Sequence, residues 1–333
     1  MSFLYITEHG TEVSVSHNCV RVQSHRGSSR NIPIETLEGI SILCKAQLTT
    51  QCAVECMKRG IPVSYYSAGG RYYGGLKPAE HVHVARQRKQ ISLYDSGFAL
   101  EFGRVILQAK IKNQETLLRR YSKNQGINIA EEIKMMNIFY GKIRKSNSMK
   151  QMMGYEGGAA KYYFQGLSKV VDEPFRFRGR SRRPPRDAFN AMLSLGYSML
   201  TNEMSGIIRN HGLHPYFGLI HRDRDNHPAL ASDLIEEWRS VIVDAVTMSL
   251  VNGHEIATED FYHDMDEPGY FLTKEGLRKF IDKLEKKERT EIKYLSYVSY
   301  PVSFRKAMEL QVGNLVRAMK EEDSSLYQPM RIR

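Results

Sequence analysis

The chain has 333 residues, of which 41% are hydrophobic and 26% charged. These proportions are typical of a folded soluble protein and exclude a mostly disordered chain. No apolar run approaches the roughly 18 residues that cross a bilayer, and the N-terminus lacks the basic start and apolar stretch of a signal peptide. Because the four cysteines show no CxxC spacing and a chain of this size needs no disulfides, we expect reduced thiols in a cytoplasmic protein. The charge of the chain also argues against membrane contact.

The net charge of +11 is distributed unevenly along the chain. Residues 1–84 carry a net charge of +2, residues 85–190 carry +13, and residues 191–333 carry −4. A basic excess confined to the middle third is typical of a surface that binds a polyanion such as nucleic acid. A basic face that serves only solubility is the alternative that charge alone leaves open.

Short β-branched segments predict β-structure in the first part of the chain. The expected strands cover residues 3–7, 13–15, 19–22, 32–34, 40–43 and 61–66. One helix interrupts them, with Thr49 or Thr50 as its N-cap and Gly60 at its end. The glycines at 69–70 and 74–75 indicate a hairpin, and they lack the GKS or GKT ending of a phosphate-binding P-loop.

From Val84 onward, apolar residues recur three and four positions apart, which predicts helices. We expect them at 86–92, 99–121, 128–145, 148–170, 187–210, 232–251, 274–295 and 301–321. The sequence therefore predicts an α+β fold: a small N-terminal β-rich domain (residues 1–76), a linker (77–84) and a larger all-helical C-terminal domain (85–333).

The first feature that points to chemistry is Glu156, which lies among small residues in the helix expected at 148–170. Each glycine costs a helix roughly 1 kcal/mol, so the two glycines and two alanines at 157–160 indicate that another group approaches closely there. Glu156 shares a helical face with apolar side chains, including Tyr163. The alternative is helix–helix packing with a solvent-facing Glu156.

The second feature is a run of arginines just before the helix expected at 187–210. Six of eleven residues are arginine: Arg176, Arg178, Arg180, Arg182, Arg183 and Arg186. Two prolines forbid a helix here, and Asp187 can cap the next one. Arginine binds phosphate through paired hydrogen bonds, and Phe177 could stack on a base. We expect phosphate contact, with a solvated loop as the alternative.

The third feature is a group of histidines and acids between residues 211 and 239. Its members are His211, His214, His221, His227, Asp223, Asp225, Asp233, Glu236 and Glu237. Carboxylates and imidazoles inside a basic protein suit a divalent metal that faces DNA. Asp233 and Glu236 share a helical face, although the same pair also fits a capping box, which needs no metal.

These three features, in this order, resemble the CRISPR-associated Cas-one family, the endonuclease and integrase of CRISPR adaptation. The matching residues are Glu156 to Ala160, Tyr163-Phe164, Arg182 to Pro185, Asp187, Asn190-Ala191, Leu193-Ser194, Gly212-Leu213, Pro215-Tyr216, Gly218, His221, Asp233-Leu234, Glu236-Glu237 and Arg239. The order of β-structure and helices also agrees, so the resemblance covers the whole chain. Departures are His214 and Ala188, where the family usually has Asp and Pro, and Asn-His-Pro at 226–228 in place of Gly-Arg-Pro. His227 could compete for a metal.

The resemblance implies a metal-dependent DNA endonuclease and integrase of antiviral defense, which inserts spacer DNA into a CRISPR array by phosphodiester transesterification. The family's metal ligands and catalytic residues, carried over by motif, are Glu156, His221 and Glu236, with Asp233 as a neighbouring acid. Carboxylates suit Mg²⁺ or Mn²⁺, and one imidazole tilts the preference towards Mn²⁺.

The predicted DNA-binding residues are the six arginines, Arg239 and Tyr163. Arg239 could instead orient a carboxylate, and Tyr163 could be a plain core residue. The resemblance further implies a homodimer formed through the β-rich domain, and an integration complex with the small partner protein Cas-two on double-stranded, branched or spacer-end DNA.

Two other functions stay open at this point. One is a non-catalytic DNA-binding scaffold, in which the acids between 233 and 236 only cap a helix. The other is an RNA-binding protein, because a basic surface does not distinguish RNA from DNA.

Overall fold

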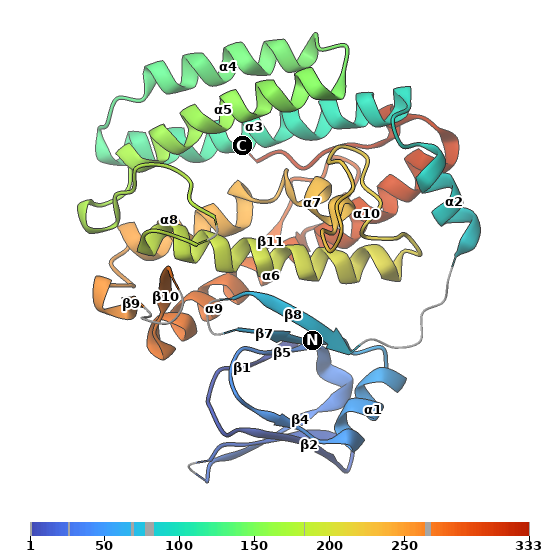
Figure 1. The fold of residues 1–333 in the computed structure, drawn as a ribbon, viewed down its shortest axis with the longest axis vertical. Helices are drawn as coiled ribbons and strands as arrows, with labels where there is room; N and C mark the ends of the chain where they lie inside the picture. The colour runs from blue at the N-terminus through green and yellow to red at the C-terminus, as the bar shows by residue number, and fades with distance from the viewer. Residues whose placement is uncertain are drawn as a thin grey trace.

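The structure is a computed structural model that describes residues 2–25, 27–67, 70–76, 83–182, 184–263 and 268–332. Figure 1 shows a β-rich N-terminal part below a larger, mainly helical part, which confirms the predicted α+β class. Most of the expected linker, residues 77–82, lies outside the described residues, so the domain boundaries stay predictions. Within the described ranges, no helix is long and apolar enough to cross a membrane.

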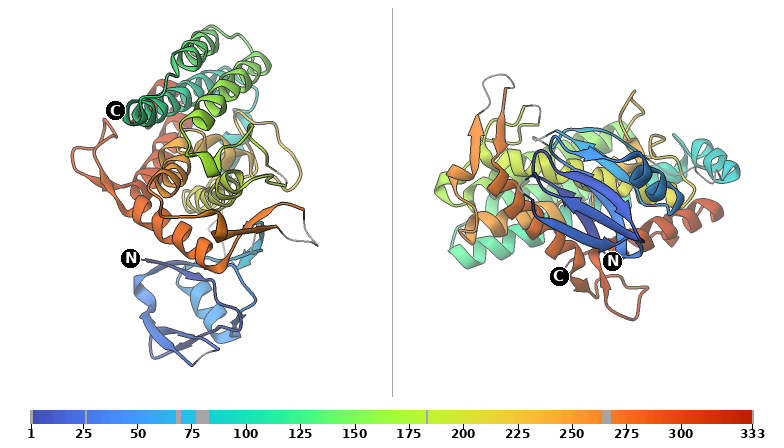
Figure 2. Two further views of the ribbon diagram at one scale, coloured as in Figure 1. Left: turned by 90° about the vertical axis from the view of Figure 1, so that its left-hand side faces the viewer. Right: turned by 90° about the horizontal axis from the view of Figure 1, so that it is seen from below.

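The N-terminal part consists of two four-stranded sheets that enclose one helix (Figure 2). The outer sheet has the order β4 (Ser29–Pro33), β3 (Cys19–Gln23), β2 (Glu12–Ser16), β6 (Gln47–Leu48). The sheet next to the helical part has the order β1 (Ser2–Ile6), β5 (Leu37–Ile42), β7 (Val63–Tyr66), β8 (Tyr72–Leu76).

Helix α1 (Thr50–Lys58) begins as predicted, because the Thr49 hydroxyl accepts a hydrogen bond from the Cys52 N–H. Cys52 and Cys56 of this helix are buried between the sheets, and all four cysteines are free thiols. The strand expected at 32–34 ends one residue early, since Ile34–Thr36 forms a 3₁₀ turn whose Ile34 is buried in the same core.

Nine α-helices of the described residues follow, and most agree with the predicted segments. They are α2 (Val84–Ser92), α3 (Gly97–Gln125), α4 (Ala130–Arg144), α5 (Met149–Lys169), α6 (Ala188–Asn210), α7 (Ala229–Ile235), α8 (Ala245–Asn252), α9 (Lys274–Arg289) and α10 (Phe304–Glu321). Helices α3, α4 and α5 form the upper layer in Figure 1, and α6 runs beneath them above strand β8.

One of the three glycines near Glu156 is explained by the packing of α4 on α5. A Cβ atom at Gly158 would lie 2.5 Å from the Phe139 ring of α4, so no larger residue fits there. Added Cβ atoms at Gly154 and Gly157 would meet nothing within 4 Å among the described atoms. The predicted close approach is therefore confirmed at Gly158, while α5 presents open space at the other two glycines.

The single helix expected at 232–251 is wrong. Helix α7 ends at Ile235, a turn covers residues 236–239, a π-helical segment covers Ser240–Asp244, and α8 follows. The apolar spacing that suggested one helix reports which side chains are buried, and it does not fix the hydrogen-bond register.

Two short β-hairpins were also missed in the part expected to be all helical. They are β9 (Phe261–His263) with β10 (Tyr270–Leu272), and β11 (Glu291–Ile292) with β12 (Val302–Ser303). The second hairpin explains why α9 ends at Arg289 instead of 295, because the Thr290 carbonyl accepts the Phe304 N–H as the chain turns back.

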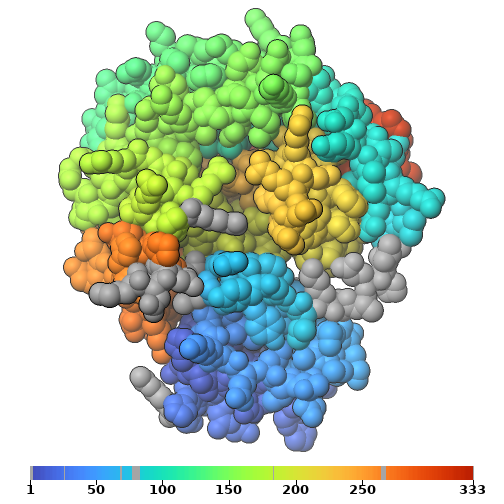
Figure 3. Space-filling model, viewed as in Figure 1, coloured from blue at the N-terminus to red at the C-terminus, as the bar shows by residue number. Residues whose placement is uncertain are grey.

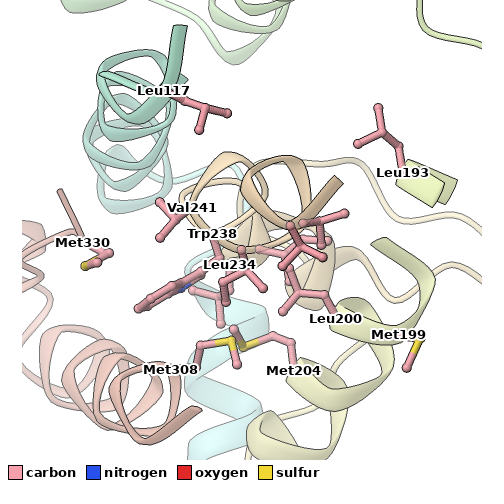
Figure 4. Packing of buried hydrophobic residues seen from close by; sticks show 14 of the residues in the cluster. Leu117, Leu193, Met199, Leu200, Met204, Leu234, Trp238, Val241, Met308 and Met330 are labelled. Atoms are coloured by element: carbon pink, nitrogen blue, oxygen red, sulfur yellow. The ribbon is translucent and has the colours of Figure 1, made fainter. Parts of the chain in front are cut away.

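Side chains at the centre of the hydrophobic core fix the position of the turn after α7. Trp238 is fully buried and meets the ring of Phe304 edge-on, with ring centroids 6.5 Å apart. Figure 4 shows Trp238 and Leu234 packed among Met204 of α6 and Met308 of α10. Because these contacts come from two further helices, α6 and α10, the residues between 236 and 239 have a fixed position in the molecule.

Candidate metal centre

Three separate elements bring the predicted ligands together. Glu156 lies on α5, His221 lies in the segment that follows α6, and Glu236 lies directly after α7. The ammonium of Lys110, on α3, forms ion pairs with Glu156 and with Glu236, whose Oε2 is 2.5 Å away. The Nε2 atom of His221 is 3.9 Å from Oε1 of Glu236. The alternative of a solvent-facing Glu156 is wrong, since its side chain is 16% exposed and paired.

A hydrogen bond to Asp233 orients the imidazole of His221. Its Nδ1 lies 2.7 Å from Oδ1 of Asp233. With the proton on Nδ1, the lone pair of Nε2 faces the cluster, which is the usual arrangement of a metal-binding histidine. Burial disfavours the charged imidazole, but the hydrogen bond and charge of Asp233 raise the pKa of His221 above its ordinary value.

Asp233 is fully buried, and both of its oxygens accept backbone hydrogen bonds. The N–H groups of Leu219 and Ile220 donate to Oδ2 at 2.7 and 2.9 Å, and that of His221 donates to Oδ1 at 2.9 Å. This geometry suits a residue that holds the histidine segment in place more than it suits a direct ligand. That Asp233 joins the metal shell stays a prediction.

The capping-box interpretation of Asp233 and Glu236 is wrong. Asp233 lies inside α7, whose N-cap is Pro228 and has no side-chain capping bond. The carboxylate is instead used entirely by the segment 219–221 and by the His221 ring. The capping-box pattern of Asp233 and Glu236 therefore no longer supports the scaffold function.

Glu236 is strongly biased towards its ionised form. Burial opposes ionisation, but the charges of Arg239, Lys110 and His221 together lower the pKa of Glu236 to about 2. Arg239 lies 3.2 Å from Oε1 of Glu236, and its side chain is 18% exposed. Of the two roles predicted for Arg239, this geometry is that of a residue that orients a carboxylate.

The buried Oε2 atom of Glu236 has a cation as its close partner, since the Lys110 ammonium lies 2.5 Å away. Two carboxylates that already bind a cation, together with an imidazole oriented by a third carboxylate, match the donor set that Mg²⁺ and Mn²⁺ prefer. The residues fit a divalent metal. As they stand, however, no three metal-ligating side chains of the described residues already converge on one point.

A buried network connects this cluster to the arginine run. Asp244, in the π-helical segment, accepts hydrogen bonds from the hydroxyls of Tyr163 and Tyr197, both at 2.5 Å. Burial raises the pKa of Asp244 to about 6, although the two hydroxyls and the nearby arginines oppose this. Arg239 and Arg180 both lie over the Tyr197 ring, 5.0 and 5.3 Å from its centroid.

Tyr163 is completely buried in this network. The predicted DNA contact of Tyr163 is wrong, because no part of its side chain reaches the surface. The alternative, a core tyrosine, is what the structure has.

The arginine run divides into surface and anchored residues. Arg176, Arg178, Arg182 and Arg186 are exposed, whereas Arg180 is half-buried and donates to Asn190 at 2.9 Å and Ser194 at 3.1 Å. Arg176 is paired with Glu173. The predicted Arg183 lies outside the described residues.

Two further predictions concern the residues that flank the arginines. Asp187 caps α6 as predicted, since its carboxylate accepts the Asn190 N–H at 2.7 Å. The predicted base stacking by Phe177 is wrong, because this ring is 5% exposed and lies parallel to Phe189 with centroids 4.6 Å apart.

His227 was considered as a competing metal ligand. Its Nε2 atom lies 3.2 Å from the Ser232 hydroxyl.

Sequence reasoning missed Lys110, Asn113 and the contacts of Glu237. Asn113 donates to the backbone carbonyls of Glu237 and Met330 at 2.9 and 3.0 Å, and Glu237 accepts the Met330 N–H. These bonds attach the C-terminal segment next to Glu236. The sequence did contain a sign of these contacts. Lys110 and Asn113 lie on the same helical face as the apolar Ile106 and Leu117 of α3, and polar residues on a buried face need partners.

The molecular surface has a recess between two of the elements that carry predicted ligands. Figure 3 shows it between α5, drawn in green, and the yellow segment that follows α6. Glu156 belongs to the first of these elements and His221 to the second.

Comparison with known proteins gives a consistent result. Residues 4–286 match the family model described as CRISPR associated protein Cas1. The chain is 33% identical over 318 residues to the CRISPR-associated endonuclease Cas1 of Mycobacterium tuberculosis, covering 95% of this chain and 94% of the relative.

Two solved structures share the fold. One is titled Casposase bound to integration product, with a TM-score of 0.86 and 22% identity over 98% of this chain and 93% of that one. The other is titled Cas6-RT-Cas1–Cas2 complex, with a TM-score of 0.85 and 24% identity over 100% of this chain and 36% of that one.

Proposed function

The chain belongs to the Cas1 family of CRISPR-associated proteins, and on that premise we propose that it is a divalent-metal-dependent DNA endonuclease and integrase of CRISPR adaptation. Its reaction inserts spacer DNA into a CRISPR array. The observation that supports this most is the cluster of Glu156, His221 and Glu236, where an oriented imidazole and two carboxylates come together from three elements and the two carboxylates already share one buried cation.

Glu156, the Nε2 atom of His221 and Glu236 would hold the metal. When bound, Mg²⁺ or Mn²⁺ polarises the scissile phosphate and lowers the pKa of the attacking hydroxyl. Asp233 keeps Nδ1 of His221 protonated and Nε2 available. Arg239 keeps Glu236 ionised and fixes its orientation through the 3.2 Å contact.

The reaction exchanges one phosphodiester for another. A 3′-hydroxyl of the spacer attacks a phosphorus atom of the target, a new P–O bond forms, and the displaced 3′-oxygen leaves with a proton. Because bond types balance, the chain has mainly to position the two DNA ends and to stabilise charge on the phosphate.

Exposed arginines of the run before α6 support such positioning. The exposed side chains of Arg178, Arg182 and Arg186 can contact backbone phosphates, which contributes sequence-independent affinity that weakens with salt.

The partners proposed for this chain follow from its relatives. One structural relative is bound to an integration product and another is part of a Cas1–Cas2 complex. We accordingly propose that this chain acts on double-stranded or branched DNA as a homodimer, in a cytoplasmic complex with Cas2.

The test uses purified protein with labelled linear and branched DNA and a supercoiled target, with and without Cas2, in EDTA, Mg²⁺ and Mn²⁺. Metal-dependent nicks and joined products are expected for the wild type, and a loss of at least about a hundredfold in Glu156→Ala and His221→Ala. His254→Ala is the matched control, since this histidine is 84% exposed and lies elsewhere.

Both variants should keep their circular dichroism spectrum and most of their DNA affinity. Salt-sensitive DNA binding without any metal-dependent product would instead favour the scaffold function. Preferential competition by single-stranded RNA over branched DNA would favour the RNA-binding function.

A further inference from the structure

Lys110 is a buried cation at the centre of the proposed metal centre. The residue is only 6% exposed, although lysine is almost never buried unless it is paired. Its ammonium forms ion pairs with Glu156 and Glu236, which come from different elements. The charge that brings these two carboxylates together is therefore supplied by a third element, helix α3.

The position of this ammonium conflicts with a metal bound by the same oxygens. An ammonium has three donors and no lone pair, so it cannot share a metal ion's coordination shell. While it lies between Glu156 and Glu236, the two carboxylates converge on Lys110 and not on a common point with His221. This agrees with the finding that no three metal-ligating groups of the described residues already converge.

We propose that Lys110 is a positioning residue that serves as a built-in cation: it holds Glu156 and Glu236 together in the metal-free protein and competes with the divalent ion for them. The inference rests on the proposed function, because it takes these residues as the metal ligands. Binding of the metal then requires the ammonium to give up at least one carboxylate.

Two consequences follow from the electrostatics. Without Lys110, two buried carboxylates lose their common counter-charge, which destabilises the metal-free protein. The same loss removes a competitor and leaves more negative potential at the site, so a divalent cation binds more tightly. A merely structural lysine would produce the first effect without the second.

The decisive variant is Lys110→Met, which keeps an unbranched apolar side chain and removes the charge. Mn²⁺ is titrated by isothermal calorimetry into the full chain after treatment with EDTA and removal of the chelator. We expect Lys110→Met to bind Mn²⁺ at least about tenfold more tightly than the wild type. Unchanged or weaker binding would overturn the inference.

Lys112→Met is the matched control on the same helix. Its ammonium pairs with Glu115 at 2.8 Å, but its side chain is 37% exposed and it does not contact the proposed ligands. We expect the Mn²⁺ affinity of this variant to stay within about twofold of the wild type. Equal tightening in both variants would show a general charge effect and would contradict a specific role of Lys110.

Thermal unfolding supplies a readout that does not depend on activity. In EDTA the Tm of Lys110→Met should fall below that of the wild type, and saturating Mn²⁺ should raise it by more than it raises the wild type. If Lys110→Met does not fold without metal, Lys110→Arg keeps the charge and should bind Mn²⁺ no more tightly than the wild type. Tighter binding by the arginine variant would overturn the inference.

Failure of the inference can be told apart from failure of the proposed function. If the wild type binds Mn²⁺, His221→Ala does not, and Lys110→Met binds no more tightly, only the inference fails. If neither the wild type nor Lys110→Met binds Mn²⁺ and no metal-dependent product forms, both fail. Binding by Lys110→Met alone would support the competition directly.

Discussion

The helical part contains two buried clusters in which several carboxylates surround one cation. The metal-centre cluster has Glu156 and Glu236 around Lys110. The Arg305 cluster consists of Glu203 on α6, Glu285 and Glu288 on α9, and Arg305 on α10. From composition alone the two are hard to distinguish.

The two clusters differ in how completely their acids are satisfied. The Arg305 guanidinium donates to Glu203 at 2.7 Å, to both oxygens of Glu285 at 3.0 and 3.3 Å, and to Glu288. In the metal-centre cluster, the Lys110 ammonium meets one oxygen of Glu156 and one of Glu236, and the His221 Nε2 atom lies 3.9 Å from the other Glu236 oxygen. An oriented imidazole that faces the acids, and not the number of acids, marks the site.

Their locations also differ. The Tyr5 hydroxyl of β1 donates to Glu285 at 3.3 Å, and the Phe3 ring lies 4.2 Å from the Arg305 guanidinium. A cavity of about 330 Å³ lies next to the Arg305 cluster, between this sheet and the helices α6 and α9. The Arg305 cluster therefore attaches the N-terminal sheet to the helical part, whereas the metal-centre cluster joins α3, α5 and the turn after α7.

The largest expected effect on stability comes from removing the cation of the Arg305 cluster. Arg305→Met leaves the carboxylates of Glu203 and Glu285 and the carboxyl group of Glu288 without their common partner, and we expect a loss of about 3–5 kcal/mol in the free energy of unfolding. Urea denaturation measures the loss. The folded fraction of the Arg305→Met variant should keep its metal-dependent nicking rate. A loss of nicking without a loss of stability would contradict a purely structural role of the Arg305 cluster.

The next largest expected effect is a change in Mn²⁺ affinity, which tests the role assigned to Asp233. Asp233→Asn cannot accept all of the backbone and imidazole donors that the carboxylate accepts, so the orientation of His221 is lost. We expect Mn²⁺ to bind about 10–100-fold more weakly in calorimetric titrations. Asp223 is an exposed residue of the same segment whose carboxylate accepts the Gly218 N–H, and the Asp223→Asn variant should bind Mn²⁺ like the wild type.

The smallest effect is a pH dependence that belongs to the Arg305 cluster. Burial and the charge of Glu203 raise the pKa of Glu288 well above its ordinary value, although Arg305 opposes them. The folded protein then holds a proton that the unfolded chain releases above about pH 4.3. The unfolding free energy of the wild type therefore falls as pH rises from there towards the raised pKa.

Glu288→Gln removes this titration while it keeps the shape of the side chain. We expect the variant to be as stable as the wild type at pH 4 and more stable by roughly 1 kcal/mol at pH 8. Urea denaturation at several pH values measures the difference. A variant whose stability falls with pH in parallel with the wild type would show that Glu288 is ionised in the folded protein.

Much of this architecture could be predicted from the sequence, because apolar spacing reports burial directly. The strands of the first part and the helices α3 to α6 follow from this spacing, whereas the caps at Thr49 and Asp187 follow from the capping preference of Thr and Asp. The break of the helix after Ile235 could not be, since Ile235, Trp238 and Ile242 are all buried whether or not the backbone stays α-helical.

The site was predicted only in part for a similar reason. Glu156, His221 and Glu236 were identified by their resemblance to a family, while the lysine that connects two of them lies far away in sequence. A sequence pattern shows that Lys110 is on a buried face, but only the packing of α3 against α5 shows which carboxylates it meets. The burial of Phe177 and Tyr163 likewise depends on packing against α6 and the π-helical segment.

The most direct test of the central claim is a Mn²⁺ titration of two matched variants, Glu236→Gln and Glu203→Gln, followed by calorimetry. Each removes one carboxylate charge from a buried cluster. If the metal centre is at Glu236, the Glu236 variant should lose Mn²⁺ binding by about a hundredfold or more, while the Glu203 variant binds like the wild type. Equal binding by both variants, or a loss confined to Glu203→Gln, would contradict the assignment.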